Sequence, residues 1–334
     1  MSILDRLDQV QSLAGRLTAV APIPSSLKIE TTTNCNHDCS YCSRQYRDRK
    51  HGNMSWGFYT RILKEAWDAG VKQVGLFFLG EPFLIKNIEE WVAEAKGHGF
   101  FVFLTTNGTA PTPDRIEAVM KAGLDSLKFS CNYCDAEQFA QIARVNPKLF
   151  WRIEHNIEEA RKIRDCGSYR CELSASSIMY SGEQQERMRE YMERIGKHVD
   201  VTYTNCFYAM SVNAGEIEAA TGYKPNAGNP GRLRLIDGEW RGIREPVPCW
   251  SAWEGHLGMG DWDEDLQDYR YHLSACCFDG SGEWNMGDLN GPHGMSFVEA
   301  WNSPKFVELR QKHIDKNVRG TVCEECIYGK TKIA

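Results

Sequence analysis

Three cysteines in one short stretch are the residues of this chain best suited to chemistry. Cys35, Cys39 and Cys42 lie within eight residues, in the spacing CxxxCxxC. Thiolates are ligands for iron-sulfur clusters and for zinc. Three thiolates leave one iron of a four-iron cluster without a protein ligand, and the amine and carboxylate of an amino acid could occupy that position. Zinc is the alternative, with His37 as a fourth ligand, but His37 lies inside the first cysteine spacing, where simultaneous ligation would be cramped.

A second group of cysteines lies in the last quarter of the chain. Cys249, Cys276 or Cys277, and the pair Cys323-Glu-Glu-Cys326 could supply four ligands to a second site. A structural zinc ion is the alternative occupant of such a set. The chain has 13 cysteines, is long and lacks a signal peptide, so metal or redox use of the thiols is favoured over a disulfide framework.

The elements that position these cysteines alternate along the chain. Strands are expected over residues 26–33, 72–79, 100–105, 126–130, 170–179 and 200–203. Helices are expected over residues 55–69, 88–98, 114–122, 151–165, 183–195 and 303–315. Alternation of this kind predicts an α/β fold with a parallel sheet, curved into a full or partial barrel. Ligands of such sheets bind at the carboxyl ends of the strands, where the first cysteine group lies.

Further motifs follow the expected strands in order. Gly80-Glu81-Pro82 follows the second strand, Thr105-Thr106-Asn107-Gly108 ends the third, and Ser130 ends the fourth. With CxxxCxxC, whose last cysteine follows the aromatic Tyr41, these segments resemble the signature of the radical S-adenosylmethionine (SAM) superfamily. Leu79 stands where that family's GGEP motif has its first glycine. The resemblance covers about residues 26–205 and implies a partial (β/α)6 barrel.

The resemblance also implies cofactors and site residues. Cys35, Cys39 and Cys42 would hold a four-iron cluster that cleaves SAM, and the resulting 5'-deoxyadenosyl radical would take a hydrogen atom from a substrate. Glu81 would accept from the methionine amine of SAM. The full set of residues expected to bind the cofactor is Tyr41, Gly80, Glu81, Pro82, Thr106, Asn107 and Ser130.

The last quarter of the chain resembles the SPASM extension of that superfamily, in its shorter twitch form. The resemblance implies a second, auxiliary four-iron cluster on Cys249, Cys276, Cys323 and Cys326, with Cys277 as the alternative to Cys276. The expected division of the chain is an N-terminal extension (1–25), a radical SAM core (26–205), a linker or insertion (206–248) and a small twitch-like domain (249–334).

The expected reaction is a dehydrogenation of a small polar substrate, such as an aminocyclitol, a sugar or a nucleoside. A fully ligated auxiliary cluster would accept the electron of the substrate radical, and a flavodoxin or ferredoxin would reduce the first cluster. Radical epimerisation is the alternative, with Cys131 or Cys206 as hydrogen donor because both follow expected strands. Peptide modification is a further alternative, although the ~25 residues before the first strand are too few for a leader-binding domain. A non-catalytic zinc-binding protein is the remote alternative.

Composition limits the partners and the location. The 334 residues carry a formal net charge of -6 without long blocks of one sign, which favours neither nucleic acid nor a membrane surface as partner. No apolar stretch approaches the ~20 residues of a membrane span, and the first residues do not read as a signal peptide. A cytoplasmic protein is expected.

Overall fold

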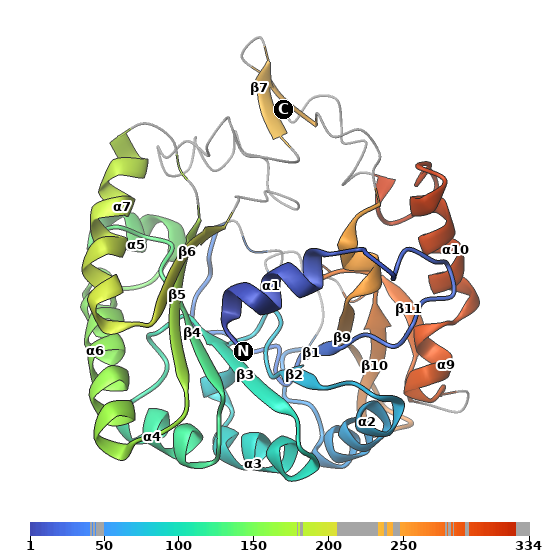
Figure 1. Ribbon diagram of the computed structural model, residues 1–334, viewed down its shortest axis with the longest axis horizontal. Coiled ribbons are helices and arrows are strands. Elements are labelled where there is room, and N and C mark those ends of the chain that lie inside the picture. Colours follow the sequence, from blue (N-terminus) through green and yellow to red (C-terminus); the bar gives the residue numbers. More distant parts are fainter. Residues whose placement is uncertain are drawn as a thin grey trace.

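A curved sheet of nine strands runs through the computed structural model (Figure 1). The structure describes residues 1–40, 42, 44, 50–178, 180, 183–205, 233–236, 239–242, 248–277, 279, 282, 284–290 and 294–324. Six neighbouring parallel strands form the first part of the sheet. They are β1 (Ser26–Ile29), β2 (Gln73–Gly75), β3 (Phe101–Thr106), β4 (Ser126–Ser130), β5 (Glu172–Ile178) and β6 (Val201–Asn205). The parallel α/β sheet predicted from the alternating pattern is therefore confirmed.

The two faces of this sheet differ in character because successive side chains of a strand point to opposite sides. On one face Leu27 pairs with Val74 and Val74 with Val102, and all three are fully buried in the core that the helices share. The opposite face, called the inner face below, carries Lys28, Gly75 and Phe103 in the same rows. The helix-covered face is thus apolar in these rows, whereas the inner face carries the charged Lys28.

Six helices between residues 56 and 195 lie around the outside of the sheet (Figure 1). They are α2 (Trp56–Ala69), α3 (Ile88–His98), α4 (Pro113–Lys121), α5 (Ala136–Ala143), α6 (Phe150–Gly167) and α7 (Glu183–Ile195). Local signals set their ends: the Ser55 side chain accepts the Phe58 N–H at the start of α2, and Gly70 ends it with a left-handed φ of 110°. The sequence analysis did not anticipate α5, which begins at an Asp135 cap.

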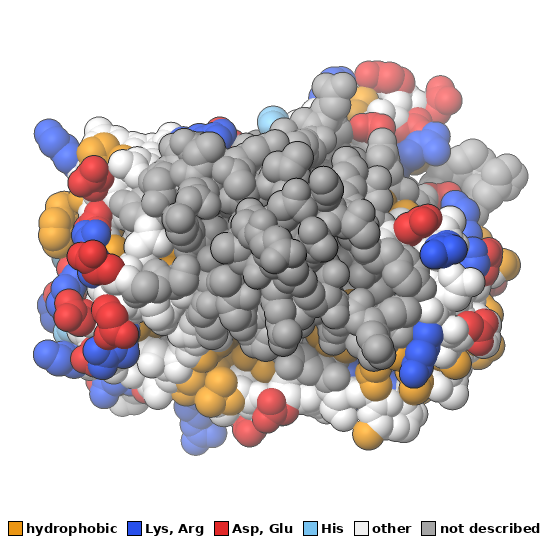
Figure 2. Space-filling view, turned by 90° about the horizontal axis from the view of Figure 1, so that it is seen from above, with side chains coloured by type: hydrophobic (Ala, Val, Ile, Leu, Met, Phe, Trp, Pro, Cys, Tyr) orange, Lys and Arg blue, Asp and Glu red, His pale blue; other side chains and the backbone are white. Residues whose placement is uncertain are grey.

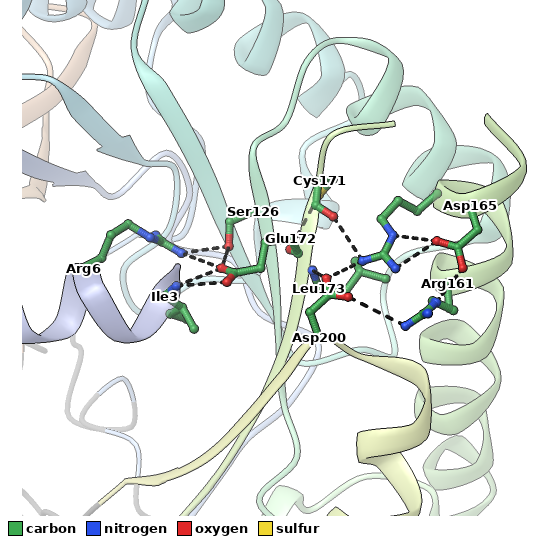
Figure 3. A network of polar contacts seen from close by, with 10 residues as sticks. Ile3, Arg6, Ser126, Arg161, Asp165, Cys171, Glu172, Leu173 and Asp200 are labelled. Carbon is green, nitrogen blue, oxygen red and sulfur yellow. Dashed lines mark hydrogen bonds and ion pairs between the residues drawn. The ribbon is translucent and has the colours of Figure 1, made fainter. Parts of the chain in front are cut away.

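A short N-terminal helix, α1 (Ile3–Gln11), closes the inner face at the beginning of the strands. Figure 3 shows Arg6 of α1 reaching Ser126, the first residue of β4, with 2.8 Å from Nη2 to Oγ. The Glu172 carboxylate, at the first residue of β5, accepts the Ile3 N–H at 2.9 Å and pairs with Arg6 at 3.7 Å. The Arg6 guanidinium also lies 4.5 Å from the centre of the Phe103 ring. Helix α1 therefore forms a floor under the inner face.

The C-terminal part of the chain extends the same sheet beyond β1. Strand β9 (Gly255–Asp263) runs parallel to β1, while β10 (Asp268–Ser274) and β11 (Asn285–Asp288) follow as antiparallel neighbours. The sequence analysis did not anticipate these three strands. The proposed division into domains stays a prediction, and its linker is described only at the antiparallel pair β7 (Leu233–Ile236) and β8 (Glu239–Gly242).

Two helices complete the C-terminal part, α9 (Phe297–Trp301) and α10 (Pro304–Ile314). Arg310 of α10 is fully buried and donates to the carbonyl oxygens of Ala252 at 2.8 Å and Trp301 at 2.9 Å. Its guanidinium also lies 4.2 Å from the centre of the Trp301 ring. Arg310 thereby fixes α10 to α9 and to the segment that follows Cys249.

The surface seen from above carries both signs of charge. Around the described part of this view, Lys and Arg side chains alternate with Asp and Glu (Figure 2). Among the helices of the described residues, none combines the length and the apolar character that a membrane span requires.

Candidate functional site

The loops that follow β1, β2 and β3 meet at one edge of the sheet, as the parallel strand order requires. The Glu81 N–H, after β2, donates to the Asn34 carbonyl oxygen, after β1, at 2.7 Å. Gly80 allows this approach, because a Cβ there would lie 2.9 Å from the Asn34 carbonyl oxygen and closer still to that of Thr32. Only glycine fits at this position without a backbone shift.

The Glu81 carboxylate accepts hydrogen bonds from three groups at this edge of the sheet. Glu81 is 2% exposed, and its Oε1 accepts the Thr106 hydroxyl at 2.8 Å and the Phe83 N–H at 3.2 Å. Its Oε2 accepts the Asn107 N–H at 2.7 Å. Burial raises the pKa of Glu81 to about 7, although these hydrogen bonds act in the opposite direction. Since each carboxylate oxygen has two lone pairs, Glu81 retains acceptor capacity for a ligand.

Asn107 connects Glu81 to the cysteine loop. Its Nδ2 donates to the Asn36 side-chain oxygen at 2.7 Å and lies 3.9 Å from the Cys35 sulfur. Its side-chain oxygen accepts from the Thr109 amide and hydroxyl, both at 2.9 Å. An amide donor beside a cysteine sulfur is typical of the surroundings of a thiolate ligand.

The three cysteines of the first group are not joined in disulfides and are partly exposed. The Tyr133 hydroxyl lies 3.2 Å from the Cys39 sulfur, and the Cys42 N–H donates to the Cys39 carbonyl oxygen at 3.0 Å. Burial raises the pKa of the Cys35 thiol to about 11, so a metal would have to displace its proton. Within the described ranges no three Cys, His, Asp or Glu side chains are close enough together to hold a metal ion. The donor set, three thiols with polar donors beside two of the sulfurs, fits an iron-sulfur cluster.

His37 contacts the protein core instead of the sulfurs. Its side chain is 3% exposed, and its Nε2 lies 2.7 Å from the Thr109 hydroxyl. The ring packs edge-on against Phe139, with 5.4 Å between centroids, and burial lowers its pKa to about 4. These contacts give His37 a packing role and do not favour the zinc alternative.

Ser130 ends the fourth strand, and Cys131, the next residue, lies on the opposite face. Ser130 lies two residues after Lys128 on the strand, so both side chains point to the inner face, where Ser130 is partly exposed. Cys131 is buried close to Tyr191 of α7, and burial raises the pKa of its thiol to about 12. This position under the helix layer does not favour Cys131 as the hydrogen donor of an epimerisation. Cys206 and Tyr41 lie outside the described residues.

Two of the four expected auxiliary ligands come together. Cys249 and Cys323 both pack against Val318, and His313 of α10 lies between them. The Cys249 N–H donates to His313 Nδ1 at 3.3 Å, so the neutral ring carries its proton on Nε2, which lies 3.4 Å from the Cys323 sulfur. The sequence analysis missed His313, which shares no motif with the cysteines.

The remaining expected ligands are only partly described. Cys276 is buried beside Cys277, and both thiols are close enough to Lys28 of the inner face to affect its pKa. Cys326 lies outside the described residues. The choice between Cys276 and Cys277 therefore stays open.

Comparisons with known proteins agree with this geometry. A family model described as the Radical SAM superfamily matches residues 29–201, more than half of the chain. A probable GTP 3',8-cyclase of Pyrobaculum aerophilum is 29% identical over 141 residues, which are 41% of this chain and 44% of that protein. A PqqA peptide cyclase of Xanthomonas euvesicatoria pv. vesicatoria is 32% identical over 132 residues, 39% of this chain and 35% of that protein. Each match thus spans less than half of the relative.

Solved structures resemble the fold over most of the chain. Streptococcus suis SuiB bound to precursor peptide SuiA superposes with a TM-score of 0.60 and 13% identity, over 92% of this chain and 71% of that one. Native anSMEcpe with bound AdoMet and Cp18Cys peptide gives a TM-score of 0.54 and 15% identity, over 92% of this chain and 88% of that one. At these identities the likeness shows the fold alone.

Proposed function

Since the chain belongs to the radical SAM superfamily, we propose that Cys35, Cys39 and Cys42 hold a four-iron cluster beside a SAM molecule bound along the loops after β2, β3 and β4. The chemistry that this cluster and SAM supply when bound is one-electron cleavage to a 5'-deoxyadenosyl radical, which takes a hydrogen atom from an unactivated C–H bond. The observation that supports this proposal best is the hydrogen-bonded connection from Glu81 through Asn107 to Cys35.

The residues of this edge have complementary roles in the proposed site. Glu81 orients Thr106 and Asn107 and offers its spare lone pairs to the methionine amine of SAM. Gly80 and Pro82 hold Glu81 in place, because Gly80 lets the loop approach Asn34 and Pro82 starts the short turn that Glu81 caps. Tyr41 and Ser130 remain proposed cofactor contacts.

We assign the net reaction to dehydrogenation of a small polar substrate, with a second four-iron cluster on Cys249, Cys276, Cys323 and Cys326 as electron acceptor. The placement of Cys249 and Cys323 around His313 supports a common site for these two ligands. Such a protein would take its first electron from a flavodoxin or ferredoxin. Epimerisation would need a thiol donor on the inner face, and the buried position of Cys131 argues against that residue.

Peptide modification is a second candidate function. It is supported by the PqqA peptide cyclase, which is 32% identical over the matched residues. The GTP 3',8-cyclase relative supports a nucleotide-like small molecule instead. The two candidates differ in the size of the substrate.

One anaerobic experiment tests the proposed chemistry without a known substrate. The reconstituted protein is incubated with SAM and dithionite, and 5'-deoxyadenosine and methionine are measured by mass spectrometry. Formation of both products in equal amounts is expected. A protein that takes up zinc in place of iron, or that forms no 5'-deoxyadenosine, would contradict the proposal.

A further inference from the structure

A cationic side chain stands on the inner face between the α1 floor and the proposed SAM loops. Lys128 lies at the middle of β4, two residues after Ser126, which contacts the α1 floor, and two residues before Ser130. Since a strand rises about 3.3 Å per residue, the Lys128 Cα lies ~7 Å from the Cα of Ser126 and from that of Ser130. Its direct neighbours across the sheet are Thr105 of β3 and Ser174 of β5, which share its face.

Lys128 differs from the other inner-face cations in its partners. Arg6 pairs with Glu172, and the Lys28 ammonium lies 2.6 Å from the Glu254 carboxylate. Lys128 makes no hydrogen bond or ion pair with any residue in the described part of the chain. An ammonium group in such surroundings is costly unless an anion accompanies it.

The curvature of the sheet brings Lys28 toward Lys128. Strands β1 and β4 are three strand spacings apart, ~14 Å along a flat sheet. Nevertheless Lys28 is close enough to lower the pKa of Lys128, which burial and this neighbouring charge together bring to about 8. The sheet is curved (Figure 1), and Lys28 and Lys128 lie near each other on its inner face.

Ser174 adds an unused hydrogen-bonding group beside Lys128. Its side chain is fully buried, and its hydroxyl has no hydrogen-bond partner among the described residues. Buried hydroxyls of folded proteins are generally paired, so an unpaired one next to an unpaired ammonium indicates a missing ligand. A ligand oxygen that carries negative charge would satisfy both groups.

We propose that Lys128 and Ser174 bind an anionic oxygen group of the substrate, a carboxylate or a phosphate, on the inner face below the SAM loops. This inference rests on the proposed function and narrows its substrate class to anionic molecules. The substrate would enter with its anionic end toward the floor, so that its reacting carbon lies toward the carboxyl ends of the strands.

The experiment measures anion binding to the reconstituted, SAM-saturated holoenzyme by anaerobic calorimetry. The probes are inorganic phosphate and malonate, with myo-inositol as a neutral probe. The variants are Lys128→Met, which removes the charge at similar volume, and Lys128→Arg, which retains it. Lys121→Met, an exposed lysine of α4, is the matched control for loss of one positive charge.

The inference predicts that at least one anion binds to the wild type and that Lys128→Met weakens this binding by about 10-fold to 100-fold. Lys128→Arg and Lys121→Met should bind it within about threefold of the wild type, and myo-inositol should not bind. The stronger of phosphate and malonate identifies the anionic group. Unaltered anion binding in Lys128→Met, or no anion binding in the wild type, would overturn the inference.

Two further measurements separate this inference from the proposed function. Substrate-independent formation of 5'-deoxyadenosine should persist in Lys128→Met, because Lys128 is not placed in the SAM site. If the wild type forms no 5'-deoxyadenosine, the proposed function is refuted. If Lys128→Met forms 5'-deoxyadenosine and binds anions as the wild type does, only the anion site is refuted. Weaker SAM binding in Lys128→Met would assign the lysine to the SAM carboxylate and overturn the inference.

Discussion

Replacement of Glu81 by Gln tests how the buried carboxyl shapes the site. The carboxyl is completely enclosed, and its pKa rises from 4.5 to about 7 on folding because burial outweighs three hydrogen bonds. Between these two pH values the folded chain binds more protons at this group than the unfolded chain does. The free energy of unfolding therefore falls as pH rises through this window.

The magnitude follows from the two pKa values. A pKa of 4.5 in the unfolded chain and about 7 in the folded one corresponds to ~3 kcal/mol of the free energy of unfolding. This contribution is lost in full above pH 8. Glu81→Gln removes this ionisation, although it sets an amide NH2 or a poorer acceptor against the Asn107 N–H at every pH. Between pH 4.5 and pH 8 the free energy of unfolding of the variant should therefore fall by ~3 kcal/mol less than that of the wild type.

The assay is urea unfolding of the metal-free, reduced protein at several pH values in that window. The difference between the two pH profiles isolates Glu81, because all other titrating groups are common to both proteins. SAM titration of the reconstituted proteins should show weaker binding by Glu81→Gln, with unchanged iron content. Parallel pH profiles would refute the assigned pKa, and unchanged SAM affinity would remove Glu81 from the site.

Three further predictions concern the clusters, the loop and the reaction. Joint replacement of the first cysteine group by Ala should leave about half of about eight irons per chain and abolish 5'-deoxyadenosine formation; unchanged iron would reject these ligands. Gly80→Ala should weaken SAM binding about 10-fold or more, because its Cβ would collide with the Thr32 carbonyl oxygen, and wild-type affinity would show that the loop adapts. In heavy water, the product should be about two mass units lighter than the substrate without deuterium at the reacting carbon; an isobaric product carrying one deuterium would mean epimerisation.

The sequence alone was sufficient for features encoded within short segments. The CxxxCxxC spacing, the glycine of Gly80-Glu81-Pro82 and the periodicity of most helices are local, as are caps such as Ser55. Because parallel strands place their carboxyl ends at one edge, the order of the motifs also predicted that these loops meet. The Glu81 N–H bond to the Asn34 carbonyl oxygen agrees with that expectation.

Other features depend on pairings that no local pattern contains. Strand β9 joins β1 from more than 200 residues away, and its glycine-rich sequence, GHLGMG, lacks the alternation that would identify a strand. Likewise, the sequence placed Cys131 after a strand, but only the pleat and the packing of α7 decided that its thiol lies under the helices.

The unanticipated polar residues follow the same rule. His313 meets Cys249 and Cys323 through the packing of α10, which Arg310 bonds to the core, and Lys128 meets Ser174 through the register of β4 and β5. Residue type and spacing thus determined which ligands and motifs the chain carries. Strand register, sheet curvature and helix packing decided which side chains face one another, because these depend on contacts between distant parts of the chain.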